Sequence, residues 1–102
     1  MNPSLSIIIP VLNEASILPD RLKALQFVRS REVELIVVDG GSTDGSLAIS
    51  HALCDRALKS PAGRAKQMNE GARQSSSEWL LFLHADTRLE EEAFEALLEA
   101  LS

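Results

Sequence analysis

Residues 36–45 read Ile-Val-Val-Asp-Gly-Gly-Ser-Thr-Asp-Gly, and they indicate the fold more directly than any other part of the chain. The apolar run of residues 35–38 is typical of a strand that is buried on both faces. The run ends at Asp39, and a glycine-rich turn then leads to a helix that we expect to begin near Ser46. Open α/β sheets bind ligands at the carboxyl ends of their strands, where glycine lets a ligand approach the backbone. Asp39 therefore indicates a binding site.

The turn after this strand also has a simpler interpretation, in which Ser42, Thr43 or Asp44 caps the following helix. Capping accounts for these three residues, but Asp39 lies too early in the chain to cap that helix. We interpret Asp39 as a binding residue, and we expect its side chain to point out of the end of the sheet.

Apolar runs and helical periods alternate along the whole chain. Strands are predicted at residues 6–11, 35–38, 56–58 and 79–83. Helices are predicted to begin at Pro19, near Ser46, at Ser60-Pro61 and at a capping box formed by residues 87–90. This alternation predicts an α/β fold. With right-handed crossovers, it is an open parallel sheet in the order 3-2-1-4 with helices on both faces.

Two of these helices carry apolar residues at helical spacing, which predicts the sides that face the sheet. The predicted stripe of the third helix is Ala65, Met68 and Ala72, and that of the last helix is Ala93, Leu97, Leu98 and Leu101.

The composition limits the class of protein. The 102 residues fit a single domain, and 45% apolar and 25% charged residues are ordinary for a soluble globular protein. The net charge of −5 disfavours a nucleic-acid-binding surface, which needs clustered basic residues. Cys54 is the single cysteine, which excludes an internal disulfide and a multi-cysteine zinc site. Since the chain has no signal-peptide pattern and no apolar run long enough for a membrane span, we expect a cytoplasmic location.

Polar residues follow three of the predicted strands. The first strand leads to Pro10, Val11, Asn13 and Glu14, the second to Asp39, and the fourth to His84 and Asp86. Because the ends of parallel strands meet at one edge, we expect these side chains to lie together. Arg64 and Lys66 add positive charge near a helix start, where the dipole already favours anions. Such an edge suits a nucleoside diphosphate, with Asp86 as a ligand of a divalent cation that bridges two phosphate oxygens.

Several of these residues have a structural alternative. Asn13 and Glu14 suit a turn and a helix start equally well. His84, after an apolar run, also suits a core position, and Lys66 also suits an exposed helix face. Gln67 is expected to be exposed or to pack against its neighbours rather than to act in catalysis.

Three blocks in this order and at these spacings resemble the amino-terminal half of a family-2 glycosyltransferase of the GT-A fold. They are residues 6–14 (SIIIPVLNE), 38–45 (VDGGSTDG) and 82–87 (FLHADT). The resemblance spans residues 5–102. Residues 63–72 (GRAKQMNEGA), taken with the third block, resemble a bacterial subset known as selenodomain-associated transferases.

The resemblance implies a Rossmann-like half of a glycosyltransferase, with residues 1–102 as a single nucleotide-sugar-binding domain that lacks the acceptor half. It implies that Asp39 accepts a hydrogen bond from the base and that residues 10–14 line the base and ribose. It also implies that Asp86, at the last position of the family's Asp-x-Asp motif, holds Mg²⁺ or Mn²⁺ on the diphosphate. An acceptor hydroxyl then takes the sugar with inversion.

The chain departs from the family pattern in three places. His84 stands where the motif has its first Asp, and its imidazole can donate to a ribose or ligate Mn²⁺. Leu12 replaces the aromatic residue that is common before Asn-Glu, so no ring stacks on the base. The resemblance places the catalytic base beyond Ser102. The catalytic residue is therefore unknown, as are the sugar, the base and the acceptor.

Another nucleotide-binding fold agrees less well with the sequence, and a function without catalysis stays open. A Rossmann dinucleotide-binding module needs Gly-x-Gly-x-x-Gly after the first strand, and residues 10–15 contain no glycine. A catalytically inactive nucleotide-binding fragment or module remains as the alternative function. An open edge of the sheet would favour self-association in either case.

Overall fold

Strand β1 (Leu5–Val11), whose seven residues are all buried, is an inner strand of the sheet. In the computed structural model, which describes residues 4–102, β1 pairs in parallel with β2 (Glu34–Asp39) and with β4 (Trp79–Phe82). β3 (Arg56–Lys59) pairs in parallel with β2, so the strand order is β3-β2-β1-β4. The predicted parallel sheet and its strand order are confirmed.

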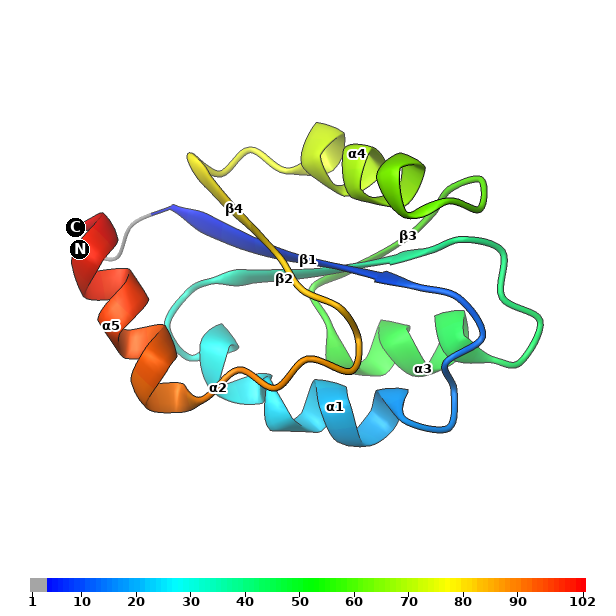
Figure 1. Ribbon diagram of the computed structural model, residues 1–102, viewed down its shortest axis with the longest axis horizontal. Coiled ribbons are helices and arrows are strands. Elements are labelled where there is room, and N and C mark those ends of the chain that lie inside the picture. The colour runs from blue at the N-terminus through cyan, green and yellow to red at the C-terminus, as the bar shows by residue number, and fades with distance from the viewer. Residues whose placement is uncertain (1–3) are drawn as a thin grey trace.

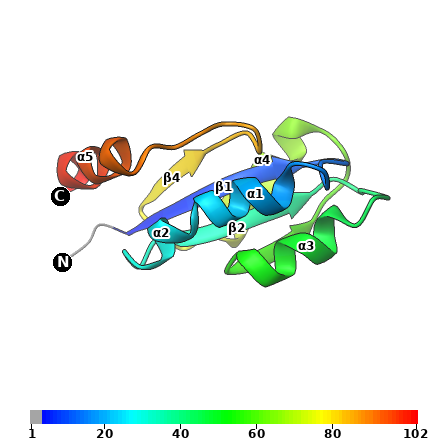
Figure 2. The ribbon, with the colours of Figure 1, turned by 90° about the horizontal axis from the view of Figure 1, so that it is seen from below.

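Helices cover both faces of the sheet, as predicted (Figure 1). α1 (Leu18–Ala24), α2 (Gln26–Arg29) and α3 (Ser46–Leu53) lie on one face, and α4 (Arg64–Gln74) lies on the other. After β4 the chain returns past α1 and α2 to α5 (Glu91–Leu101), which lies near the amino-terminal end of the sheet (Figure 2). No helix formed by residues 4–102 is both long enough and apolar enough to cross a membrane.

The core has two parts because successive side chains of a strand point to opposite faces. Ile7 and Ile9 belong to the larger part, which also contains Phe94 of α5. Ile8 belongs to a smaller part beneath α4. There α4 approaches the sheet closely at Gly71, since a Cβ at this position would lie 2.5 Å from Cγ2 of Ile8.

Two predicted helix starts are wrong. α4 begins at Arg64 rather than at Ser60-Pro61. α5 begins at Glu91 with Glu90 at its N-cap and without a side-chain capping bond, so the capping box does not form. The N–H of Thr87 instead donates to the carbonyl of His84 at 3.0 Å, which closes a turn after β4.

The predicted apolar stripes are only partly correct. On α4 the fully buried residues are Gln67 and Gly71, whereas Ala65 is exposed. On α5 they are Phe94 and Leu98, whereas Ala93 is exposed.

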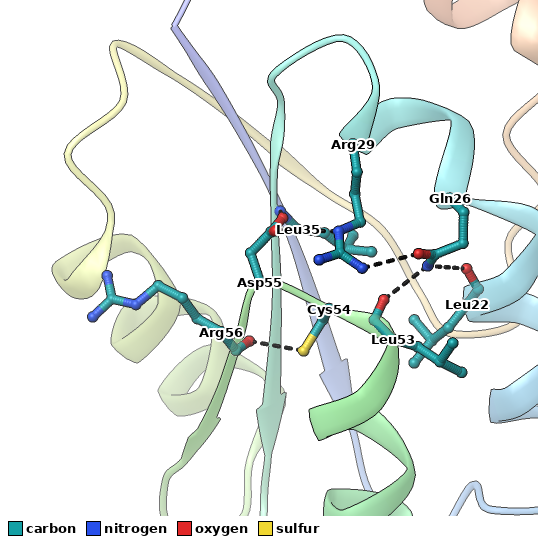
Figure 3. A network of polar contacts seen from close by, with 8 residues as sticks. All are labelled: Leu22, Gln26, Arg29, Leu35, Leu53, Cys54, Asp55 and Arg56. Atoms are coloured by element: carbon teal, nitrogen blue, oxygen red, sulfur yellow. Dashed lines mark hydrogen bonds and ion pairs between the residues drawn. The ribbon is translucent and has the colours of Figure 1, made fainter.

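A polar network lies at the amino-terminal ends of β2 and β3 (Figure 3). Asp55 accepts hydrogen bonds from the N–H of Leu35 at 2.7 Å and from Nε of Arg29 at 3.1 Å. Gln26 donates through Nε2 to the carbonyls of Leu22 and Leu53, both at 2.8 Å, and accepts from Arg29 through Oε1. These side chains join α1, α2 and α3 to the sheet.

Candidate functional site

Asp39 ends β2, and its side chain is buried with 3% of its surface exposed. Oδ2 accepts hydrogen bonds from the N–H groups of Gly41 and Ser42 at 3.0 and 2.8 Å. Asp39 therefore holds the glycine turn in place, a structural role that the sequence does not indicate. Oδ1 is buried as well and has no hydrogen-bond partner among residues 4–102.

An unpartnered carboxylate oxygen in a buried position is uncommon, since desolvation costs free energy that a hydrogen bond normally offsets. Space lies open beside the turn, because no atom outside residues 40–42 lies within 4 Å of the place of a Cβ on Gly41. Asp39 therefore has one oxygen that shapes the turn and a second that is suited to a ligand N–H donor.

The loop after β1 is joined to the turn after β2 by hydrogen bonds. The N–H of Asn13 donates to Oγ of Ser42 at 2.8 Å, and Oδ1 of Asn13 accepts from the N–H of Thr43 at 2.8 Å. Asn13 has a φ of 51°, in the left-handed region that asparagine tolerates better than most residues. The side chain of Asn13 is thus used within the protein, which favours its structural alternative.

Asp44 also joins the loop after β1 to the turn after β2, close to the start of α3. Its Oδ2 accepts from the N–H of Ala15 at 3.0 Å, and its Oδ1 accepts from Oγ of Ser46 at 2.6 Å. The Ser46 hydroxyl first, and then the Ala15 N–H, hold the pKa of the Asp44 carboxyl below its ordinary value of 3.8. Ser46 also accepts from the N–H of Glu14 at 3.0 Å. Residues expected to cap α3 therefore link the two strand ends.

A cavity of about 240 Å³ lies between the end of β1 and the start of α4. Its lining consists of Pro10, Val11, Leu12, Glu14, Gly63, Arg64 and Gln67. The side chains of Arg64 and His84 are in hydrogen-bond contact, which brings the end of β4 to the same place. The N–H of Gly40 donates to the carbonyl of Val11 at 3.0 Å, so the turn that follows Asp39 adjoins this cavity.

The structure thus brings most of the predicted residues to one edge. Pro10, Val11, Glu14 and Arg64 line the cavity, and His84 contacts it through Arg64. Asn13 does not line it.

Asp86 is exposed and lies in the turn closed by His84 and Thr87. His84 and Asp86 therefore belong to a turn and not to one extended segment. No group of three or more His, Cys, Asp or Glu side chains within residues 4–102 is arranged to hold a metal ion. The exposed carboxylate of Asp86 fits a cation that takes its other ligands from water and phosphate oxygens.

Gln67 is the cavity residue that sequence reasoning missed. It is 4% exposed, and its Nε2 donates to the carbonyls of Val11 and Val38. The spacing of Gly63, Gln67 and Gly71 is a signal that was available, because residues four apart share one side of a helix.

The chain has clear sequence relatives. The profile of the family Glycosyl transferase family 2 matches residues 6–102. A PGL/p-HBAD biosynthesis glycosyltransferase of Mycobacterium tuberculosis is 40% identical over 96 residues. This match covers 87% of the chain and 38% of the relative, so the chain spans less than two fifths of that protein's length.

Solved structures show the same fold. A mannosyltransferase from Pyrobaculum calidifontis, in complex with GDP-Man and Mn²⁺, superposes with a TM-score of 0.75 at 22% identity. It covers 99% of this chain, which corresponds to 32% of the neighbour. Staphylococcus aureus TarS superposes with a TM-score of 0.79 at 24% identity, covering 92% of this chain and 31% of the neighbour.

Proposed function

The chain belongs to glycosyl transferase family 2, and from this premise we propose that its strand-end site binds the nucleoside diphosphate of a nucleotide-activated sugar. The observation that carries the proposal is the buried, unpartnered Oδ1 of Asp39. A ring N–H of a base would supply the missing donor in a charge-assisted hydrogen bond. The fold neighbour with bound GDP-Man and Mn²⁺ supports the same donor class.

The other site residues receive roles from their positions around the cavity. Pro10, Val11 and Glu14 line the cavity, where the base and ribose would lie, and Val11 pairs with Asp39 in the sheet. Asn13 shapes this loop through its bonds to the next turn. Arg64, at the start of α4, adds a positive charge to a helix end that favours phosphate. His84 contacts Arg64 and would donate to the ribose or a phosphate.

We propose Asp86 as the protein ligand of Mg²⁺ or Mn²⁺. Its exposed carboxylate, with His84 nearby in the chain, suits an ion whose remaining ligands are water and diphosphate oxygens. A cation bound there would offset the negative charge that develops on the leaving diphosphate.

In a longer protein, we propose that an acceptor hydroxyl displaces the diphosphate with inversion at the sugar carbon. The resemblance places the base that deprotonates this hydroxyl beyond Ser102. We therefore propose that residues 1–102 form a single donor-binding domain that does not transfer sugar by itself. Transfer by the purified chain from a panel of sugar nucleotides, lost in Asp86→Ala, would contradict this.

Three further proposals rest on less direct observations. The outer edge of β4 has no paired strand among residues 4–102, and Trp79, Leu80 and Phe82 are all more than a third exposed, which favours self-association there. A cytoplasmic location is proposed from the composition alone. Membership of the selenodomain-associated subset stays a prediction from residues 63–72.

Titration of the purified chain with UDP, GDP, ADP and CDP, each with and without Mn²⁺, tests the proposed function. We expect heat of binding with at least one nucleotide and tighter binding with Mn²⁺. Absence of binding to all four nucleotides, with and without the metal, would overturn the proposal.

A further inference from the structure

We propose that Gln67 is a positioning residue, which fixes the separation of the two strand ends that form the nucleotide site. The inference rests on the proposed function. Gln67 lies one turn after Arg64 on α4 and is 4% exposed. Gln67 differs from the other side chains of α4 because its amide is buried and both N–H groups of that amide are used within the protein.

The amide of Gln67 bridges two strands. Nε2 donates to the carbonyl of Val11 at 2.8 Å and to the carbonyl of Val38 at 2.9 Å. An amide nitrogen has two N–H groups, so both are used. The reverse orientation of the amide would place its oxygen against two carbonyl oxygens, which is repulsive. The two hydrogen bonds therefore fix the side chain.

The two carbonyls belong to the last residues before the site. Val11 ends β1 and precedes the loop that lines the cavity, and Val38 immediately precedes Asp39. The Val11 carbonyl also accepts from the N–H of Gly40 at 3.0 Å. One carbonyl oxygen thus holds β1, the turn after β2 and α4 together.

The residue opposite Gln67 leaves it room. A Cβ on Gly40 would lie 2.8 Å from Cδ of Gln67 and 2.9 Å from its Oε1, closer than side chains pack. Gly40 is itself buried. The amide therefore fills the space directly above the turn that Asp39 shapes, and a change at Gln67 would reach Asp39 through this contact.

Gln26 offers a matched control at the other end of the sheet. Its Nε2 also donates to two backbone carbonyls, those of Leu22 and Leu53 (Figure 3). We compare Gln67→Met with Gln26→Met by melting temperature and by calorimetric titration with the nucleotide that the wild-type chain binds. Both variants should melt earlier. Only Gln67→Met should bind nucleotide more weakly, by about tenfold.

The outcomes separate the two proposals. If the wild-type chain binds none of the four nucleotides, the proposed function fails, and this inference fails with it. If the wild type binds and Gln67→Met binds equally well, or if Gln26→Met loses as much affinity, only the positioning role is wrong.

A second variant gives a pH profile that a purely structural residue would not produce. Gln67→Glu introduces a carboxyl that can donate one hydrogen bond only when protonated, and burial favours the protonated form. Relative to wild type, its nucleotide affinity should recover as the pH falls from about 8 to about 5.5. The charged and titratable groups around the cavity are the same in both proteins, so their own titration cancels in the ratio of affinities. They are Glu14, Asp39, Arg64, Lys66 and His84. If the ratio of the nucleotide affinities of Gln67→Glu and wild type stays constant over this pH range, the positioning role is contradicted.

The wild-type chain provides a readout that does not depend on folding of a variant. The side-chain amide protons of Gln67 should exchange slowly with solvent, and their NMR shifts should move when nucleotide binds. The side-chain amide protons of Gln26 should also exchange slowly, but their NMR shifts should not change when nucleotide binds. Unchanged chemical shifts of the Gln67 amide protons at saturating nucleotide would contradict the inference.

Discussion

At the amino-terminal end of the sheet, Asp55 has both carboxylate oxygens in hydrogen bonds, whereas at the carboxyl-terminal end Asp39 finds partners for one oxygen among the described residues 4–102. The bonds of Asp55 come from Arg29 and from the N–H of Leu35, and they connect α2 with β2 (Figure 3). The bonds of Asp39 go to its own turn. Oδ1 of Asp39 is buried and has no partner among residues 4–102.

Aspartate side chains therefore have different roles at the two ends of the sheet. The amino-terminal end stabilises the packing of helices on the sheet, because Gln26 and Asp55 hydrogen-bond to groups of α1, α2, α3 and β2. Cys54 fits this pattern, since its thiol donates to the carbonyl of Arg56 and burial raises its pKa above the ordinary value of 9.0. The carboxyl-terminal end of the sheet, where Oδ1 of Asp39 has no partner among residues 4–102, carries the predicted ligand residues. Substitutions at the two ends should consequently separate stability from nucleotide affinity.

The largest expected effect on stability is that of Asp55→Ala. The substitution leaves the fully buried N–H of Leu35 without an acceptor, which should lower the free energy of unfolding by about 1–3 kcal/mol. Urea denaturation measures this loss. Nucleotide affinity of the folded variant should equal that of wild type, and a weakened affinity would show that the two ends are not independent.

Asp86→Ala should leave stability unchanged and remove the coupling between metal and nucleotide. Because Asp86 is exposed, no packing is lost. In the wild type, Mn²⁺ and the nucleotide should each raise the affinity of the other by the same factor, of about tenfold. Titrations of nucleotide with and without Mn²⁺ measure this factor. Coupling that survives the substitution, or tight Mn²⁺ binding without nucleotide, would show that Asp86 has another role.

The smallest expected effect is the titration of Asp44. The pKa of Asp44 is lower in the folded chain than the ordinary value of 3.8. The ionised carboxylate therefore stabilises the fold at pH values above 3.8. This contribution is lost as the pH falls through the folded pKa. The amide shifts of Ala15 and Ser46 should follow this titration with a midpoint below 3.8. A midpoint above that value would mean that the two loops are not joined through Asp44.

The sheet could be predicted from the sequence because β1, β2 and β4 are short apolar runs and right-handed crossovers leave few arrangements. The helix starts were harder. Residues 87–90 have the pattern of a capping box, yet the N–H of Thr87 closes the turn after β4, so the helix begins later. α2 was not predicted, because four residues directly after Leu25 give no period of their own.

The places of Asp39 and His84 at strand ends were predictable, because they depend on the order of the strands along the chain. The site was not predictable where it depends on tertiary packing. Nothing in the sequence indicates that one oxygen of Asp39 is used by its own turn. Gln67 was expected to be exposed or packed, and only the close approach of α4 at Gly71 explains why an amide is buried there.

The most direct test of the difference between the two ends compares Asp39→Asn with Asp55→Asn by calorimetric titration with nucleotide. Asparagine keeps one carbonyl oxygen, which can still accept from the N–H groups of Gly41 and Ser42, but it replaces the second oxygen with a donor. Asp39→Asn should therefore cost about 1–3 kcal/mol of nucleotide binding with little change in melting temperature. Asp55→Asn should leave nucleotide affinity unchanged. Equal affinities for Asp39→Asn and wild type, at full folding of both, would contradict the assignment of Asp39 to base recognition.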